Sequence, residues 1–258
     1  MNSAQPPWPL EALWQQLDVL WPGLSVELLP EVDSSNTELM RRARAGWHEP
    51  LLLIAERQSA GRGRLGKSWS SQPGQALTFS LGLPLAPRDW SGLSLAVGLA
   101  LAESLHPAVQ IKWPNDLWLD GARKLCGILI ETASSAGSDA AERYCVIGVG
   151  LNIHCPPGAD LATPAASLQE LLPGSDAGSA LLRLAPALLQ AVQTFAQQGF
   201  APLQPRFAAR DLLRARNVRL SDGRQAWCEG VAADGALLLR DGAGLQALTS
   251  ASVSVRPM

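Results

Sequence analysis

A short loop rich in glycine and basic residues is the part of this chain best suited to hold an anion. Residues 60–69, "AGRGRLGKSW", carry Arg62, Arg64 and Lys67 between three glycines. Glycines give the backbone freedom and expose its N–H groups, and Arg and Lys side chains gather around phosphate or carboxylate oxygens. This stretch, called the basic loop below, is either an anion-binding segment or a solvated basic turn.

The same letters match two nucleotide-binding motifs in part. Gly61, Gly63 and Gly66 have the G-x-G-x-x-G spacing of a dinucleotide site, and residues 61–68 spell the G-x-x-x-x-G-K-S of a P-loop. Both motifs need a helix that begins at the loop. The next residues, "KSWSSQPGQ", include a Pro-Gly pair and do not favour a helix. We therefore reject the dinucleotide interpretation and keep the P-loop as a minority alternative.

Three further segments place special residues at the ends of apolar runs. "IKWPNDLWL" puts Lys112, Asn115 and Asp116 around a proline, and such groups in apolar surroundings are costly unless they are paired or used. "ARKLCGILIE" puts Lys124 directly before an apolar run. "VIGVGLNI" holds two glycines before Asn152, which indicates a bulge, a ligand close to the backbone or tight sheet packing. A paired turn and a surface lysine remain the structural alternatives for the first two.

Lysine usage points to the same segments. Of the 21 basic residues, only Lys67, Lys112 and Lys124 are lysines, and the others are arginines. Lysine offers a compact point charge on a flexible stem where arginine offers a planar fork. The three positions therefore favour chemistry over general surface charge.

These residues must be positioned by a mixture of helices and strands. Hydrophobic spacing predicts helices over residues 10–21, 37–45, 93–105 and 181–195, with a capping box at Ser35 and a disruptive Pro186 in the last one. Strands are expected over residues 26–29, 50–58, 76–83, 109–113, 116–120, 126–131 and 144–153. This order is not a regular βαβ alternation, so we predict an α+β fold with a mainly antiparallel sheet flanked by helices.

The pattern changes near residue 216. Asp-Gly turns at Asp222, Asp234 and Asp241 separate short apolar runs, which is typical of a small β-barrel. We predict a larger domain over residues 1–212 and an SH3-like C-terminal barrel over residues 213–258.

Composition excludes several classes of protein. Hydrophobic residues make up 47% and charged residues 17% of the chain, and the net charge is −2, so neither a disordered protein nor a broad nucleic-acid footprint is expected. Four cysteines without a C-x-x-C pair argue against a zinc site or a disulfide framework. We expect a cytoplasmic protein, since no apolar run is long enough for a membrane span and no signal peptide is evident.

The chemical segments, in this order, resemble the biotin protein ligase family. The matching pieces are "DSSN" at 33–36, "ERQSAGRGRLGKSW" at 56–69, "KWPNDL" at 112–117, "RKLCGIL" at 123–129 and "VIGVGLNI" at 146–153. The likeness extends from about residue 28 to the C-terminus. The combination of all five pieces is far more specific than any one of them.

The resemblance implies an ATP-dependent ligase. The family forms biotinyl-5′-AMP from biotin and MgATP, then transfers biotin to one lysine of the biotin carboxyl carrier protein domain, as on acetyl-CoA carboxylase. That reaction brings a carboxylate to an α-phosphate, so cations that neutralise both anions would assist it. No protein metal site is expected, because Mg2+ would be held mainly through the ATP phosphates. A homodimer remains open, since the sequence does not fix the oligomeric state.

Site residues follow from the matched positions. Lys124 and Arg62 are the implied catalytic residues, and Ser35 has an alternative role as a helix N-cap. The implied biotin contacts are Ser34, Ser35, Asn36, Gln58, Arg62, Gly63, Arg64, Lys124 and Gly127. The implied ATP or adenylate contacts are Trp69, Lys112, Asn115, Asp116, Asn152 and Arg256.

The likeness does not extend to the N-terminal winged helix that some family members carry. Residues 1–32 contain no Lys or Arg, so we expect a short form without sequence-specific DNA binding. The competing functions are a lipoate-protein ligase of related fold and a non-catalytic nucleic-acid-binding module.

Overall fold

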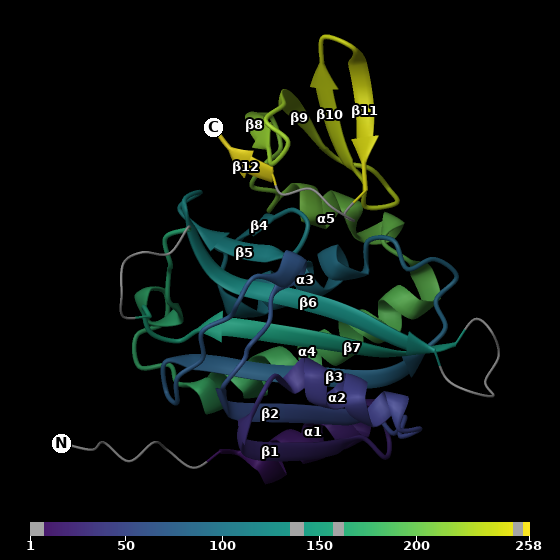
Figure 1. The fold of residues 1–258 in the computed structure, drawn as a ribbon, viewed down its shortest axis with the longest axis vertical. Coiled ribbons are helices and arrows are strands. Elements are labelled where there is room, and N and C mark those ends of the chain that lie inside the picture. The colour runs from purple at the N-terminus through teal and green to yellow at the C-terminus, as the bar shows by residue number, and fades with distance from the viewer. Residues whose placement is uncertain (1–7, 135–141, 157–162, 250–254) are drawn as a thin grey trace.

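Two β-sheets organise the chain. The computed structural model describes residues 8–134, 142–156, 163–249 and 255–258. A seven-stranded sheet with helices on both faces forms the larger part, and a five-stranded antiparallel sheet lies beyond one edge of it (Figure 1). The α+β prediction is confirmed.

The large sheet has the strand order β1-β2-β3-β7-β6-β5-β4. Only the β1–β2 pair is parallel, and every other neighbouring pair is antiparallel. The strands are β1 (Ser25–Val32), β2 (Leu51–Gln58), β3 (Ala76–Leu85), β4 (Gln110–Lys112), β5 (Asp116–Leu119), β6 (Arg123–Ser134) and β7 (Arg143–Asn152). The predicted hairpin between β5 and β6 turns at Asp120 and Gly121, which both have positive φ, as a tight two-residue turn requires.

Helices cover the sheet unequally. On one face lie α1 (Leu10–Leu20), α3 (Leu93–Leu105) and α4 (Ala177–Gln198), and on the other lies α2 (Ser35–Arg44) (Figure 1). The alternation of side chains along a strand explains both layers. In β2, Leu52 and Ile54 join the main core, whereas Leu51 and Leu53 join a smaller cluster beneath α2.

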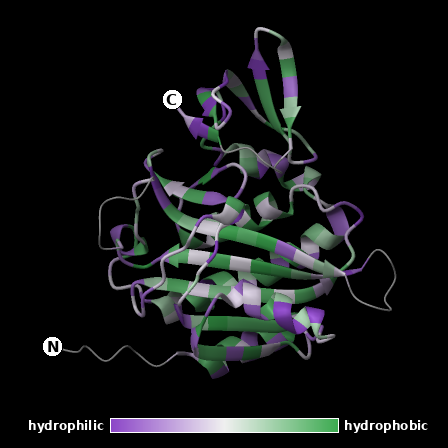
Figure 2. Ribbon diagram, viewed as in Figure 1, coloured by the Kyte–Doolittle hydropathy of each residue, from purple (hydrophilic) through white to green (hydrophobic). Residues whose placement is uncertain are grey.

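Hydropathy follows these layers. Hydrophobic residues dominate the strands of the large sheet, while hydrophilic residues gather on α2 and in the connecting loops (Figure 2). A β-sheet that is covered on both faces needs apolar side chains on both faces. The part of the sheet that α2 leaves uncovered lines a pocket next to the basic loop.

The start of α2 differs from the sequence prediction. The helix begins at Ser35, and Ser34 is its N-cap, with Oγ accepting from the Thr37 N–H at 3.5 Å. The expected start at Thr37, with Ser35 as the cap, was wrong. Since Ser34 takes the capping position, the Ser35 side chain is available for other contacts.

Pro186 does not break α4. The helix runs unbroken over Ala177–Gln198, longer than the predicted 181–195. Proline in a helix costs about 3 kcal/mol, but this helix buries Leu181, Leu184 and Leu188 completely. Burial of one such side chain contributes about 1.5–3 kcal/mol, so packing outweighs the local disruption.

The C-terminal part is all β after one short helix, α5 (Gln204–Ala208). Its strand order is β11-β10-β9-β8-β12. The strands are β8 (Arg216–Leu220), β9 (Gln225–Val231), β10 (Leu237–Asp241), β11 (Gly244–Leu248) and β12 (Val255–Pro257). The predicted turns at Asp222 and Asp234 are each followed by a glycine with positive φ.

Backbone pairing joins this part to the large sheet. The Ile111 N–H donates to the Arg210 carbonyl at 2.8 Å, and the Leu212 N–H donates to the Ile111 carbonyl at 3.0 Å. The indole N–H of Trp113 reaches the Gly235 carbonyl at 3.1 Å. The C-terminal sheet is therefore held beside β4, near the end of the strand that carries Lys112.

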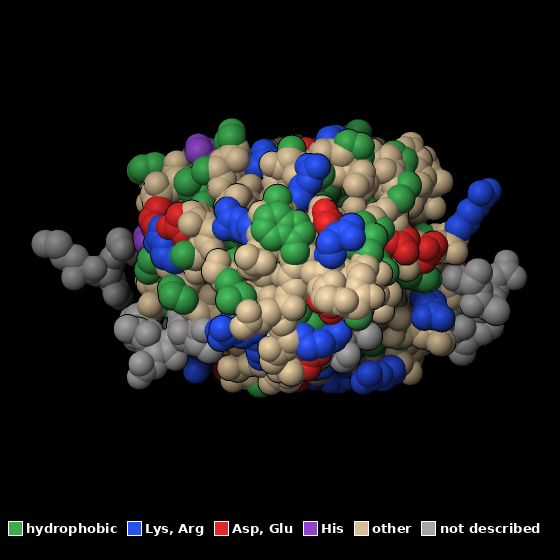
Figure 3. Space-filling model, turned by 90° about the horizontal axis from the view of Figure 1, so that it is seen from above, with side chains coloured by type: hydrophobic (Ala, Val, Ile, Leu, Met, Phe, Trp, Pro, Cys, Tyr) green, Lys and Arg blue, Asp and Glu red, His purple; other side chains and the backbone are tan. Residues whose placement is uncertain are grey.

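The surface at this end of the molecule is mixed. Seen from the side of the C-terminal sheet, Lys and Arg side chains are interspersed with acidic and apolar ones (Figure 3). A surface that follows a nucleic-acid backbone usually groups its cations, and the described residues on this face do not. Within the described ranges, no helix is long and apolar enough to cross a membrane.

Candidate active site

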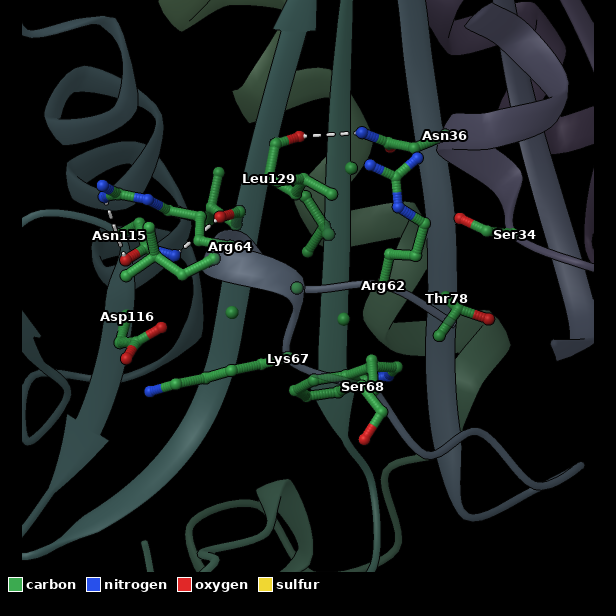
Figure 4. A pocket seen from close by; sticks show the side chains of 18 of the residues that line it. Ser34, Asn36, Arg62, Arg64, Lys67, Ser68, Thr78, Asn115, Asp116 and Leu129 are labelled. Atoms are coloured by element: carbon green, nitrogen blue, oxygen red, sulfur yellow. Dashed lines mark hydrogen bonds between the residues drawn. The ribbon is translucent and has the colours of Figure 1, made fainter. Parts of the chain in front are cut away.

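A pocket opens between α2, the basic loop and strands β5, β6 and β7 (Figure 4). It brings together most of the residues singled out from the sequence. Among those that line it are Ser34, Ser35, Asn36, Gln58, Arg62, Gly63, Arg64, Lys67, Trp69, Lys112, Asn115, Asp116, Lys124 and Gly127. Segments nearly a hundred residues apart thus contribute to one cleft.

Uncharged polar side chains line one end of the pocket; three of them are buried and Gln58 is partly buried. The Ser35 N–H donates to Gln58 Oε1 at 2.8 Å. The Ser80 hydroxyl lies 2.6 Å from Asn36 Oδ1 and 2.7 Å from Ser35 Oγ. Because Asn36 Oδ1 can only accept, Ser80 donates to it and accepts from Ser35. The Asn36 amide nitrogen donates to the Leu129 carbonyl at 3.1 Å, which fixes the orientation of the amide. We call Ser34, Ser35, Asn36 and Gln58 the polar end.

Two glycines of β7 make room for this arrangement. A Cβ at Gly148 would lie 2.1 Å from Asn36 Oδ1, and a Cβ at Gly150 would lie 2.4 Å from Trp69 Cε2. Neither glycine has positive φ, so the requirement is steric and not conformational. The strand glycines flagged in the sequence are therefore sites of close approach.

The opposite end of the pocket is cationic. Lys124 Nζ lies 2.8 Å from Asp116 Oδ1 and 5.7 Å from the centre of the Trp69 ring. A Cβ at Gly127 would come within 3.1 Å of that ammonium. The Asn115 amide donates to the Ile128 carbonyl at 2.8 Å, which holds β5 against β6. We call Arg64, Lys112 and Lys124, with their neighbours Asn115 and Asp116, the cationic end.

Lys112 shows the electrostatic character of this end. Its side chain is buried, with Nζ 5.2 Å from the centre of the Trp118 ring. The pKa of Lys112 is lowered to about 8, mainly by burial; Asp116 opposes this change, and the positive charges of Lys124, Lys67 and Arg256 add to it. Three cations and one carboxylate therefore act on this buried ammonium. An anionic ligand here would relieve the repulsion.

The basic loop folds over the pocket as a tight hairpin. The Gly63 N–H donates to the Lys67 carbonyl at 2.7 Å, and the Trp69 N–H donates to the Gly61 carbonyl at 2.8 Å. A single 3-10 turn covers Arg64–Gly66, and Lys67 after it is extended. Because no helix begins at the Lys-Ser pair, the P-loop interpretation is wrong.

The two arginines of the loop point to opposite ends of the pocket (Figure 4). Arg64 Nη1 lies 3.5 Å from Asn115 Oδ1, and burial lowers the pKa of Arg64 while Asp116 opposes that change. Arg62 turns to α2, donating to Thr37 Oγ1 at 3.2 Å. The catalytic role that the likeness to biotin protein ligases implied for Arg62 stays a prediction, and Arg64 is the loop arginine that lies beside Asn115 at the cationic end.

Comparisons with known proteins agree with this geometry. Residues 29–152 match the model of the Biotin/lipoate A/B protein ligase family. The chain is 35% identical over 245 residues to the bifunctional ligase/repressor BirA of Escherichia coli, covering 91% of this chain and 75% of that protein. The chain belongs to the biotin protein ligase family.

Two other biotin protein ligases support the assignment. The biotin–[acetyl-CoA-carboxylase] ligase of Paracoccus denitrificans is 33% identical, over 88% of this chain and 98% of that protein. The solved biotin protein ligase from Aquifex aeolicus in complex with biotin and ATP superposes with a TM-score of 0.76 at 26% identity. That match covers 92% of this chain and 100% of the Aquifex chain.

Two residues that the likeness to biotin protein ligases implied as adenylate contacts lie outside the pocket lining. The buried Asn152 amide donates to the Lys124 carbonyl at 3.2 Å and to the Ala166 carbonyl at 3.0 Å. It therefore fixes the backbone that carries Lys124. Arg256 is exposed on β12, yet its charge is close enough to lower the pKa of Lys112.

The sequence analysis also missed residues that support the polar end, and two of them form its hydrogen-bond network. Ser80 lies within the apolar strand "ALTFSLGL", where it and Thr78 are two hydroxyl residues at alternate positions, which was the only signal in the sequence. Glu131 follows the apolar run "LCGILI", and its Oε2 accepts from Asn36 Nδ2 at 3.0 Å. No group of His, Cys, Asp and Glu residues suited to a metal ion occurs among the residues that the structure describes.

Proposed function

We propose that this pocket joins biotin to ATP as biotinyl-5′-AMP and then transfers biotin to a lysine of a biotin carboxyl carrier protein. The chain is a biotin–[acetyl-CoA-carboxylase] ligase, an activity supported by its identity to ligases of that name over most of its length. One observation supports the site best: a single cleft has one end lined mainly by uncharged polar side chains, with Arg62 at its border, and a strongly cationic end. That is the polarity of a substrate with a ureido ring at one end and a carboxylate at the other.

The polar end suits the ureido ring. A cyclic urea offers one carbonyl acceptor and two N–H donors, so it needs both donors and acceptors within a small apolar pocket. Ser35, Asn36 and Gln58 supply both kinds of group, and their orientations are fixed by the Ser80 network. Ser34 lines the same end.

The cationic end suits the reacting groups. In adenylation, a biotin carboxylate oxygen forms a bond to the α-phosphorus of ATP. The bond from the α-phosphorus to the oxygen that bridges it to the β-phosphate breaks, and pyrophosphate leaves. Lys124, Lys112 and Arg64 bring positive charge to one place, which offsets the repulsion between two anions and the charge that develops in the transition state. Asp116, 2.8 Å away, holds Lys124 in position before the substrates arrive.

Magnesium would enter with the nucleotide. When bound to ATP, Mg2+ neutralises phosphate charge. Asp116 is the carboxylate among the described lining residues that could contact the ion, and the phosphates would supply most other ligands. The residues therefore fit a nucleotide-borne ion better than a resident one.

The walls suit the rest of the adenylate. Trp69 presents an apolar ring beside Gly127 and Gly150, and an aromatic face can stack on adenine or cover the adenylate. Asn115 and Arg256 add polar and charged groups on the nucleotide side. The backbone around Gly63, in the loop above, closes the biotin side.

The basic loop suits the second half-reaction. An acyl-adenylate hydrolyses readily, so a closed loop that excludes water preserves it until a carrier lysine arrives. The lysine amine then attacks the biotin carbonyl carbon, forming the amide as AMP leaves. Loop closure and opening would therefore set when the carrier gains access.

The test compares the two acids that this family uses. Radiolabelled biotin and radiolabelled lipoate are each incubated with the chain, MgATP and a carrier domain, and incorporation is counted. We expect label from biotin on the carrier lysine and little from lipoate. Preferential lipoate transfer would favour the lipoate-protein ligase alternative, which the family name includes.

A further inference from the structure

A carboxylate outside the pocket lining connects the polar end to the basic loop. Glu131 lies on β6, and its two oxygens have different partners. Oε2 accepts from Asn36 Nδ2 at 3.0 Å, and Oε1 lies 3.2 Å from Arg62 Nη2. We propose that Glu131 is a positioning residue that couples occupancy of the polar end to closure of the basic loop; its link to biotin rests on the proposed function.

The contact on the loop side is held at two points. Arg62 also donates to Thr37 Oγ1 at 3.2 Å, so one guanidinium touches both the first turn of α2 and the end of β6. The hairpin hydrogen bonds of Gly63 and Trp69 follow directly in the chain. Holding Arg62 therefore fixes the stem from which the loop folds over the pocket.

The contact on the pocket side is held equally firmly. Asn36 is nearly fully buried, and its Oδ1 is bound by Ser80 while its Nδ2 donates to both Leu129 and Glu131. A ligand that binds the Asn36 amide restrains it further and so restrains Glu131. The carboxylate passes this restraint to Arg62, and the loop is steadied when the polar end is filled.

The competing explanation is that Glu131 serves only to satisfy the buried Asn36 amide. The substitution Glu131→Gln separates the two roles. Its amide oxygen can still accept from Asn36, but its amide N–H groups offer nothing to the Arg62 guanidinium, which only donates. Arg62→Ala removes the other partner of the same ion pair.

A matched control exists on neighbouring strands. Arg57 on β2 and Glu31 on β1 form an ion pair of the same type at 2.9 Å, with both side chains about half exposed. Glu31→Gln removes that pair without touching the pocket lining. This variant shows how far the loss of an Arg–Glu pair elsewhere in the protein changes exchange of the loop peptide.

The experiment is hydrogen–deuterium exchange of the unliganded full chain, followed on a peptide that spans residues 60–69. Exchange through local opening follows the opening equilibrium. We expect Glu131→Gln and Arg62→Ala each to speed exchange of this peptide about two- to fivefold, the range for a partly exposed ion pair. The double variant should exchange no faster than either single variant, and Glu31→Gln should match the wild type. Unchanged exchange in Glu131→Gln, or multiplied effects in the double variant, overturns the proposal.

A second measurement tests the coupling. Biotin added to the wild type should slow exchange of the loop peptide, and this protection should fall by about the same two- to fivefold factor in Glu131→Gln. Full protection in that variant overturns the coupling. The unliganded comparison does not depend on ligase activity, so failure of biotin to react would contradict the proposed function and leave the Glu131–Arg62 result standing.

Discussion

Replacing Gly148 by alanine should disrupt the polar end of the pocket. The new Cβ would lie 2.1 Å from Asn36 Oδ1 and 2.8 Å from its Cγ, distances that real Cβ atoms do not show. Gly148 has no positive φ, so alanine fits the backbone and the whole effect is steric. The Asn36 side chain must leave its position.

The size of the effect follows from the contacts that are lost. Asn36 gives up hydrogen bonds to Ser80 at 2.6 Å, to Glu131 at 3.0 Å and to Leu129 at 3.1 Å. At about 0.5–1.5 kcal/mol each, three bonds amount to about 2–4 kcal/mol of unfolding free energy. For a chain of this length that corresponds to a fall of about 4–12 °C in Tm. Biotin affinity should also fall, by about tenfold or more, because the displaced Asn36 side chain disrupts the polar end of the pocket.

Calorimetry measures both quantities, Tm by scanning and biotin Kd by titration. Gly98→Ala is the control, since a Cβ there meets Ile111 at an ordinary 3.5 Å and the helix favours alanine. Adding Asn36→Ala to Gly148→Ala removes the clash, so the double variant should be as stable as Asn36→Ala alone. A Gly148→Ala protein with the wild-type Tm and biotin Kd would refute the steric argument.

Three other outcomes are expected. The pKa of Lys112 is lowered, mainly by burial, to about 8 from its ordinary 10.5. Between these two pH values the unfolded chain binds more protons than the folded chain, so the contribution of Lys112 to stability rises with pH across that window. Bound ATP phosphates should raise this pKa again, so titration calorimetry near pH 8 in two buffers should show proton uptake on nucleotide binding, and no uptake would contradict the assignment. Lys124→Ala should lower the adenylation rate by about 100-fold or more, with a much smaller change in Tm; full activity would exclude its catalytic role. Burial raises the pKa of the Cys126, Cys145 and Cys228 thiols to about 12, so a thiol reagent should label only Cys155 rapidly in the native protein; fast labelling of a second thiol would argue against this packing.

The convergence of the chemical segments was predictable from the sequence. Residue types that are expensive to bury, such as Lys112 with Asp116, stood at the ends of apolar strands, and the two strand glycines marked a close approach. These signals are local. Each depends on the cost of burying a charge or on the space that a Cβ needs, so each can be seen without knowing the fold.

Side-chain directions were not predictable. The likeness to known ligases implied a catalytic role for Arg62, which stays a prediction, but nothing in the spacing indicated that Arg62 faces Thr37 while Arg64 reaches Asn115. Ser35 could cap a helix as well as Ser34, and only the packing against Gln58 and Ser80 distinguishes them. Such choices depend on neighbours more than twenty residues away in the chain.

Tertiary packing also determines two features that local sequence patterns did not predict. Pro186 lies inside α4 because the apolar face of that helix is buried over its length. Glu131 looked like the polar end of a strand, and its contacts with Asn36 and Arg62 come from elements far apart in sequence. Neither could be inferred from spacing alone.

The most direct test of the central claim is biotin-dependent exchange of labelled pyrophosphate into ATP. If one cleft holds the biotin carboxylate beside the α-phosphate, label should enter ATP when biotin is present and not when it is left out, and Arg64→Ala should slow the exchange. Exchange or ATP turnover at the same rate without biotin, or no exchange with it, would contradict the account.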